Sequence, residues 1–374
     1  MPNKQLQCAL ETCCHRAAKR FKTEKKYLYL ILDDWERGYS VYKVDVDAFD
    51  SSSDAGAAPD PLPEPPVVRF EARHSGSWYF AAHRTKILAM HPSGCRAFPA
   101  FDVQTTALTV CPWPRRRQQG PPQAALRCFD DSNRISSFAL HSDGRTLFIS
   151  QDKNTFSFDT ESQEWDDHGN WSMPFKGEAY FDSELDAWVG LCCHKGGEGY
   201  LCACDVMPVA ADCRRLPAWK LGKDPLFDAG SRRHLGATLV CTSDTKYCLI
   251  ESLARDDEED LRRLHQDMYY PHRRVISVTT FGLKYDKHGE LTTTQRKVQS
   301  YEMTDAHQLP ERSWKPVAFW MELVLLQSFD RIKSLEADLE RTKIALQAAV
   351  AKQMELEETV EALQHRPDAL QLQF

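Results

Sequence analysis

The sequence lacks the long apolar run that a membrane-spanning helix needs. Nowhere in its 374 residues do about 18 apolar residues follow one another, and the N-terminal residues show no basic start followed by an apolar segment, as a secretory signal would. An excess of positive charge is missing too, because 47 Lys and Arg are outnumbered by 54 Asp and Glu, giving a net charge of -7. We therefore expect an intracellular protein, cytoplasmic or nuclear, that binds neither membranes nor nucleic acid.

Contiguous signatures of catalysis or nucleotide binding are also absent, since the chain contains no GxSxG, HExxH, GxGxxG or GxxxxGK[ST]. Its 13 cysteines are an odd number, which favours reduced thiols over a disulfide framework. Zinc-type ligands occur at Cys192, Cys193, His194, Cys202 and Cys204. Adjacent residues of a strand point to opposite faces, so a tetrahedral set is awkward and buried free thiols are expected. We predict no catalytic residue, no metal site and no cofactor, and hence a protein that is not an enzyme.

Short runs of β-branched and aromatic residues, separated by turn clusters, fill the chain from Lys26 to Met303. They recur in a fixed order, as in SSFAL, the turn HSDG, RTLFIS and TFSFD. Five such units are visible, and the third strand of each ends on an aspartate: Asp45, Asp102, Asp159, Asp205 and Asp286. The spacing of about 46 to 81 residues suits four-stranded propeller blades with insertions. We predict an all-β, kelch-like β-propeller of five or six blades. A β-sandwich is the alternative, but a β-sandwich does not predict that the turns recur in a fixed order along the chain.

The five aspartates could form a ring of carboxylates for a cation, but we expect them to accept backbone N–H bonds in the turns between strands. Trp165, Trp188 and Trp219 fall at comparable points of the repeat and are expected in the core between blades. The first unit lacks its opening strand. Residues before Lys26 or the segment around 314–320 could supply it, and the sequence does not decide between them.

The C-terminal segment predicts a long helix that pairs as a coiled coil. Aliphatic residues alternate at spacings of three and four, which places them on one stripe of a helix. Charges beside the stripe favour a parallel pair, and the polar Gln353 would fix its register. The predicted core positions are Leu325, Ile332, Leu335, Leu339, Leu346, Ala349, Gln353, Leu356, Val360 and Leu363. The alternative is an amphipathic helix folded back on the side of the propeller.

These patterns divide the chain into five parts. We expect a basic N-terminal segment at 1–25, the repeat domain at 26–303, a linker at 304–320, the coiled-coil helix at 321–365 and a tail at 366–374.

Several phrases carry a family resemblance, among them YLYLILDDWERGYSVYKVD, GRTLFISQDKNTFSFDTESQEWDDHGNW, MPFKGEAYFDSELDAWVGL and RRHLGATLVC. They resemble a plant family, expanded in grasses, that is catalogued as domain of unknown function 1668, over roughly residues 26 to 303. The resemblance implies a plant origin and a propeller-like domain, without an assigned activity. TFSFDTESQEW is also distantly similar to kelch repeats and F-box-associated propellers.

A rigid repeat domain beside a heptad stripe favours a non-enzymatic interaction scaffold. Its propeller face would bind a protein partner, and its coiled coil would dimerise the chain or dock it to another helical protein. The alternative is a propeller enzyme or small-ligand-binding protein with its site at the central channel.

Overall fold

The computed structural model of the protein describes residues 25–35, 37–49, 58–72, 78–91, 97–112, 135–209, 216–255, 273–304 and 315–323. These residues form strands β1 to β21 and one short 3-10 helix, Val46–Ala48. The prediction of an all-β domain is confirmed. No helix among the described residues is long and apolar enough to cross a membrane.

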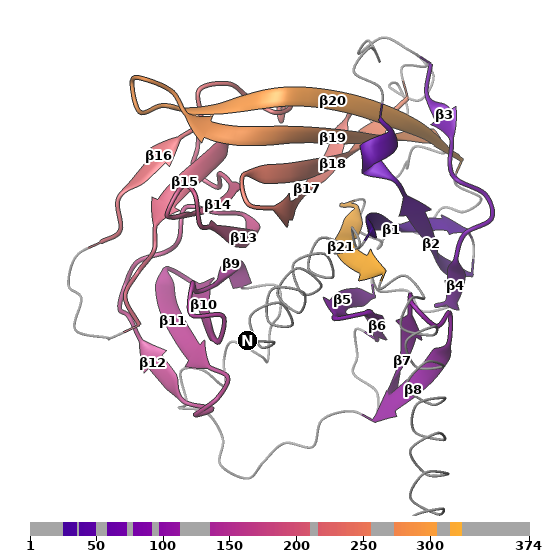
Figure 1. Ribbon diagram of the computed structural model, residues 1–374, viewed down its shortest axis with the longest axis horizontal. Helices are drawn as coiled ribbons and strands as arrows, with labels where there is room; N and C mark the ends of the chain where they lie inside the picture. The colour runs from indigo at the N-terminus through magenta and orange to yellow at the C-terminus, as the bar shows by residue number, and fades with distance from the viewer. Residues whose placement is uncertain are drawn as a thin grey trace, which may run out of the picture. The chain divides into compact units, whose positions relative to one another are not determined.

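The strands build five units of four strands each, which we call blades 1 to 5 (Figure 1). Blade 1 contains β21 (Val317–Leu323), β1 (Lys25–Trp35), β2 (Gly38–Val44) and β4 (Val68–Glu71). Blade 2 contains β5 (Tyr79–His83), β6 (Lys86–Met90), β7 (Ala97–Asp102) and β8 (Leu108–Pro112). Blade 3 contains β9 (Ile135–Leu140), β10 (Thr146–Gln151), β11 (Asn154–Asp159) and β12 (Trp165–Asp167).

Blades 4 and 5 complete the set. Blade 4 contains β13 (Gly177–Asp182), β14 (Ala187–Leu191), β15 (Leu201–Asp205) and β16 (Trp219–Leu221). Blade 5 contains β17 (His234–Ser243), β18 (Lys246–Ala254), β19 (Arg273–Tyr285) and β20 (Leu291–Thr304). The two-residue strand β3 (Asp60–Pro61) pairs in parallel with the outer edge of β20, and the innermost strands of blades 3 and 4 also pair in parallel.

The blades of the unit Lys26–Glu322 are arranged around a common centre, with β21, β5, β9, β13 and β17 innermost. Face-to-face packing joins blade 1 to blade 2, blade 3 to blade 4, blade 4 to blade 5 and blade 5 to blade 1. The ring of Tyr39 in blade 1 lies 5.0 Å from that of Phe80 in blade 2, and Phe148 of blade 3 lies 5.1 Å from Trp188 of blade 4. This arrangement of four-stranded sheets is a β-propeller, and the described residues supply five blades.

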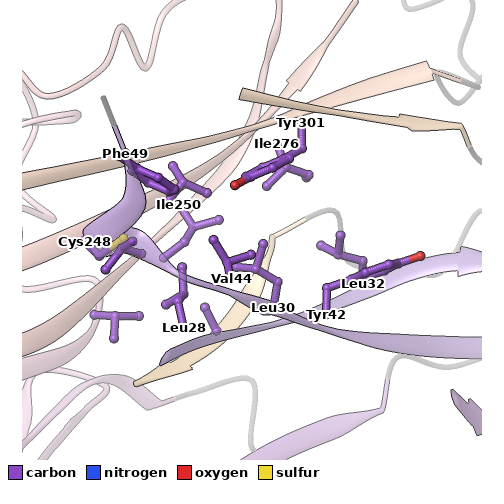
Figure 2. Packing of buried hydrophobic residues seen from close by; sticks show 14 of the residues in the cluster. Leu28, Leu30, Leu32, Tyr42, Val44, Phe49, Cys248, Ile250, Ile276 and Tyr301 are labelled. Atoms are coloured by element: carbon purple, nitrogen blue, oxygen red, sulfur yellow. The ribbon is translucent and has the colours of Figure 1, made fainter. Parts of the chain in front are cut away.

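Blades 1 and 5 share a large apolar core, which Figure 2 shows from close by. Alternate residues of β1 point to the same face, so Leu28, Leu30 and Leu32 all pack toward blade 5. They meet Cys248 and Ile250 of β18 across the interface. Burial of each large apolar side chain contributes roughly 1.5–3 kcal/mol. The alternation that predicted strands therefore also holds the blades together.

Strand β21 closes the ring. It lies beside β1 and supplies the innermost strand of blade 1, whose other strands come from the start of the chain. Of the two segments considered for this strand, the C-terminal one is used. Its residues overlap the end of the predicted linker and the first residues of the predicted helix, because Ala318 and Met321 are buried in the propeller. The other boundaries stay predictions.

Candidate functional site

The five aspartates of the repeat lie at the ends of the third strands of blades 1 to 5. Carboxylates accept bonds from backbone N–H groups two to four residues further along, at 2.8 to 3.3 Å, at Asp45, Asp102, Asp159 and Asp286. Asp205 uses its own N–H, which donates to the Ala218 carbonyl at 2.9 Å. Four of the five carboxylates therefore cap their own turns, and the described residues bring no three His, Cys, Asp or Glu together as metal ligands.

A sixth aspartate, Asp182, has a larger role that the sequence reasoning missed. It ends β13, the innermost strand of blade 4, and its side chain is buried. One carboxylate oxygen caps its own turn, and Oδ2 accepts bonds from the Thr245 N–H at 2.8 Å and the Tyr247 hydroxyl at 2.9 Å, both in blade 5. The segment GEAYFD ends on an aspartate, as the third strands of the repeat do. This similarity was the signal in the sequence that could have pointed to Asp182.

The predicted coiled-coil positions lie outside the described residues, as do the remaining parts of the predicted helix. They are Leu325, Ile332, Leu335, Leu339, Leu346, Ala349, Gln353, Leu356, Val360 and Leu363.

The cysteines considered for zinc are free thiols in blade 4. Cys192, Cys202 and Cys204 are buried, and Cys193 is exposed. A hydrogen bond from Cys202 lowers the pKa of the Cys192 thiol to about 7, whereas burial raises the pKa of Cys204 to about 12. The Cys202 sulfur also lies 3.4 Å from the Pro174 carbonyl oxygen.

A groove of about 630 Å³ opens between blades 5 and 1. Its walls come from the end of β17, the start of β18, the middle of β19 and β20, the strand β21 and the 3-10 helix. Trp320 is the half-buried aromatic residue of the lining, whereas the side chains of Tyr247 and Phe281 are buried in the core between blades 4 and 5. Because β21 closes the ring here, both ends of the chain's propeller region contribute to the groove.

A β-bulge shapes one wall of this groove. Thr280 pairs with Lys297 and Gly282 pairs with Thr294, so two residues of β20 oppose the single Phe281. The first of them, Gln295, has a φ of 50°, in the left-handed region that non-glycine residues rarely adopt. In a regular strand, neighbouring side chains point to opposite faces. Here three consecutive residues, Gln295 to Lys297, all border the groove.

Three cationic side chains and one carboxylate line the groove: Lys246, Arg296, Lys297 and Asp47. The Lys297 ammonium donates to the Phe49 carbonyl at 2.9 Å, and the Arg296 guanidinium donates to the Leu226 carbonyl at 3.0 Å. Both groups carry further N–H donors. Within the described part of the chain, the Lys246 ammonium forms no ion pair. The Lys297 side chain therefore reaches toward blade 1, whereas the Arg296 side chain reaches toward Leu226 in the core between blades 4 and 5.

A second surface lies at the outer edge of blade 4. Leu216, Trp219 and Leu221, which we call the β16 surface, are 64%, 42% and 38% exposed. Trp219 and Leu221 are two residues apart in β16 and so share a face. The Trp219 ring stacks on His194 with a centroid distance of 4.6 Å. Trp188 lies in the core between blades as expected, but Trp219 does not, because β16 is the last strand of its blade.

Charged residues also gather where the innermost strands begin. Lys315 precedes β21, and its ammonium lies close to Gly177 of β13. A Cβ atom added at this glycine would be 3.2 Å from the Lys315 nitrogen. Glu178 follows, and its carboxylate accepts a bond from the Tyr180 hydroxyl at 3.0 Å. Both residues are exposed. Partial loss of hydration beside neighbouring segments of the chain raises the pKa of Glu178 and lowers that of Lys315.

A family model described as "Protein of unknown function (DUF1668)" matches residues 25–121 and 113–301. The chain belongs to this family. No curated protein matches the sequence. The family's matched region begins at β1 and ends within β20, so it spans all five blades but not the closing strand β21.

Solved structures with similar arrangements include β-propellers. The β-propeller domain of Cps50 (Swd1) from Myceliophteria thermophila is 9% identical, with 62% of this chain and 73% of that chain covered and a TM-score of 0.24. The WD40 domain of SCAP from fission yeast is 9% identical, with 76% and 64% covered and a TM-score of 0.24. Hsv2 from Kluyvelomyces marxianus is 10% identical, with 73% and 70% covered and a TM-score of 0.24. The fold assignment rests on the sheet topology described above.

Proposed function

We propose that this protein is a non-enzymatic interaction scaffold whose propeller binds a protein partner at the β16 surface. The observation that carries this proposal is the exposed Trp219, held by its stack on His194 beside the exposed Leu221. Exposed aromatic and aliphatic side chains that lie together commonly mark protein interfaces. A ring held in one orientation loses little conformational freedom on binding, which suits it as an anchor residue.

The position of β16 supports this proposal further. It is a three-residue strand at the outer edge of blade 4, and among the described strands it pairs with β15 alone. Its exposed side chains lie next to polar groups, such as Lys220, whose ammonium lies 5.7 Å from the ring centre of Tyr285. An apolar centre with a polar rim is the usual composition of a protein interface.

A photo-crosslinking experiment tests the docking surface. A photoreactive amino acid is placed at Trp219 and, as a matched control, at Val110 on β8, the last strand of blade 2, which is 71% exposed. We expect a discrete adduct in cells from position 219 only, and Trp219→Ala should prevent the adduct's protein from co-purifying with the full-length chain. Identical adducts from both positions, or undiminished co-purification, would contradict the proposal.

The C-terminal segment is proposed to dimerise the chain, or to dock it to another helical protein, as a parallel coiled coil. Light scattering on the full-length chain and on residues 1–324 measures this, since 1–324 retains β21. We expect a dimer mass that falls to a monomer on truncation. Equal monomeric masses would exclude self-association. The kelch similarity, the plant origin and a cytoplasmic or nuclear location are further parts of the proposal.

A second candidate function is a propeller enzyme or small-ligand-binding protein with its site at the central channel. The opposite charges of Glu178 and Lys315, which lie close together near the start of the innermost strands β13 and β21, favour it. Such a site would bind a small polar molecule through both charges. A metabolite that raises the melting temperature of the native chain but not of Glu178→Gln would support this candidate, and equal shifts in both proteins would contradict it.

A further inference from the structure

Two thiols of blade 4 lie together beneath the β16 surface. Cys202 pairs with Gly190 across β14 and β15. Two residues further along, the Cys192 N–H donates to the Tyr200 carbonyl at 2.9 Å, which continues the same register. Both cysteine side chains therefore lie on one face of the blade, and the Cys202 thiol donates a hydrogen bond to the Cys192 sulfur. Leu221 pairs with Cys202 from the other side, so the β16 surface shares this face with the two thiols.

The two thiols differ in their chemistry. The Cys192 sulfur accepts hydrogen bonds from the Cys202 thiol and, at 3.4 Å, from the His194 N–H. Both bonds favour the thiolate and lower the pKa of Cys192 to about 7, whereas the bond to Cys192 and burial raise the pKa of Cys202. Because oxidants attack the thiolate, Cys192 is the nucleophile of the pair. Cys202 keeps its proton and can resolve an oxidised neighbour.

A short turn separates the Cys192 sulfur from solvent. Residues 193–196 of this turn are exposed, and Gly197 follows without a side chain. A Cβ atom added at Gly197 would be 2.5 Å from the Cys192 sulfur, so the sulfur lies directly against the turn. Exposed turns open locally at a low free-energy cost. A small oxidant can therefore reach this sulfur, although Cys192 is buried.

The same turn supports the β16 surface. The His194 backbone bonds the Cys192 sulfur, and the His194 ring stacks on Trp219 with a centroid distance of 4.6 Å. A Cβ atom added at Gly197 would also be 3.1 Å from the Leu221 Cδ1 atom, so this glycine contacts both Cys192 and Leu221. A change at the Cys192 sulfur therefore affects the support of both Trp219 and Leu221.

We propose that Cys192 is a peroxide-sensitive modification site, which forms a disulfide with Cys202 and thereby loosens the β16 surface and weakens its binding of a partner. The Cys192 thiolate attacks one oxygen of hydrogen peroxide, the O–O bond breaks and hydroxide leaves, which gives a sulfenic acid. The Cys202 thiol then attacks the Cys192 sulfur. The S–S bond forms, the S–O bond breaks, and the hydroxyl group leaves as water with the Cys202 proton. The two thiols lose two electrons, and the peroxide is reduced.

The disulfide changes the turn in two ways. It removes the negative charge to which the His194 N–H is bonded, and it draws the Cys192 sulfur toward Cys202. The turn then holds the His194 ring less firmly, and Trp219 loses part of its support. An anchor residue that must be ordered on binding lowers the affinity. The effect on a partner rests on the function proposed above, whereas the disulfide itself does not.

Peroxide treatment of the native full-length protein tests the disulfide. Trypsin cleaves after Lys195, which separates Cys192 from Cys202, so mass spectrometry of a non-reduced digest shows their disulfide as two linked peptides. We expect these linked peptides in the native chain and in Cys193→Ser, the matched control at an exposed neighbouring thiol. They should be absent from Cys202→Ser, in which dimedone should trap the sulfenic acid at Cys192. Dithiothreitol should reverse the disulfide.

Hydrogen exchange shows whether oxidation reaches the β16 surface, and it needs no partner. We expect the amides of residues 194–197 and 219–221 to exchange severalfold faster after oxidation, while those of β10 in blade 3 stay unchanged. Peroxide should have no such effect on Cys192→Ser. The protein that crosslinks at position 219 should bind the oxidised chain about threefold or more weakly than the reduced chain.

The proposal is overturned if the linked peptides do not form, if Cys193 is oxidised while Cys192 stays reduced, or if exchange at 219–221 does not change on oxidation. It is also overturned if the oxidised and reduced chains bind the crosslinked protein equally well. If the linked peptides form and exchange becomes faster but no protein crosslinks at position 219, the function proposed above is contradicted and the redox site is supported.

Discussion

The carboxylate of Asp182 and the hydroxyl of Tyr247 lie 2.9 Å apart, and their hydrogen bond joins blade 4 to blade 5. Both side chains are buried. The same carboxylate oxygen accepts the Thr245 N–H from the turn between β17 and β18. Burial and the neighbouring carboxylate raise the pKa of the Tyr247 hydroxyl, so it stays a donor at physiological pH.

Removal of this hydroxyl should weaken the contact between blades. We expect Tyr247→Phe to lower the free energy of unfolding by roughly 1.5–3 kcal/mol, because a buried carboxylate loses a charge-assisted donor. Urea unfolding followed by tryptophan fluorescence measures the change. Tyr285→Phe, at a residue that is 37% exposed, is the control and should change stability by less than about 0.5 kcal/mol. Equal midpoints for both variants would show that the hydrogen bond contributes nothing.

Asp143 should make stability depend on pH in the acid range. Partial burial opposes its ionisation, but hydrogen bonds from Thr146 and from the Arg145 N–H hold its pKa well below the usual value. A lowered folded-state pKa contributes stability above the unfolded value of about 3.9, and that stability is lost as pH falls further. Asp143→Asn should therefore be less stable than the native chain by about 1–3 kcal/mol at pH 7.

The difference between the two proteins should shrink as pH falls from about 5 toward 2. Chemical unfolding at several pH values measures it. Asp224→Asn, at an exposed loop residue, is the control and should follow the native curve throughout. A stability difference that stays constant across this range would rule out the charge as its cause.

Trp188 and Trp219 offer a matched pair of tryptophans in one blade. Trp188 is fully buried, and its indole N–H donates to the Leu140 carbonyl of blade 3 at 3.0 Å. Its replacement by Ala should cost about 3–5 kcal/mol, whereas Trp219→Ala should cost less than about 1 kcal/mol. Thermal unfolding distinguishes them, with Trp188→Phe as a milder variant if the alanine form does not fold. Similar losses at both positions would contradict this account of the interface.

Ring closure can be tested by the place of truncation. A chain that ends at 324 keeps β21, whereas a chain that ends at 316 loses it and exposes the apolar faces of Leu28 and Leu30. We expect residues 1–324 to unfold cooperatively and residues 1–316 to melt at a much lower temperature or aggregate. Equal melting temperatures would show that the ring does not depend on β21.

The bulge predicts a stabilising substitution. Gln295 holds a positive φ, which costs a non-glycine residue on the order of 1 kcal/mol. Gln295→Gly should therefore raise the free energy of unfolding by up to about 1 kcal/mol, while Ser300→Gly in the regular part of β20 should lower it by about 0.5–1 kcal/mol. Urea unfolding of both variants measures the two changes. A loss of stability in Gln295→Gly would contradict the claim that the positive φ of Gln295 strains the backbone.

Local patterns predicted much of this fold because strand formation leaves a local signature. Alternation of apolar and polar residues, with turn residues at regular intervals, placed the strands around Asp45, Asp102, Asp159, Asp205 and Asp286. Trp188 was expected in the core between blades and lies there. The DUF1668 resemblance is confirmed by the family match, and the coiled-coil positions stay predictions.

The groove, the bond between Asp182 and Tyr247, and the choice of β21 as the closing strand had no comparable signature. Each depends on residues from distant parts of the chain, such as Asp47 and Arg296 in the groove or β1 and β21 in blade 1. A bulge also depends on the register between two strands, which the composition of either strand does not reveal. The sequence by itself determined the repeated strands and their turns, because these follow from neighbouring residues. Only the tertiary structure decided how the ring closes and where its groove lies, because both arise from packing between blades.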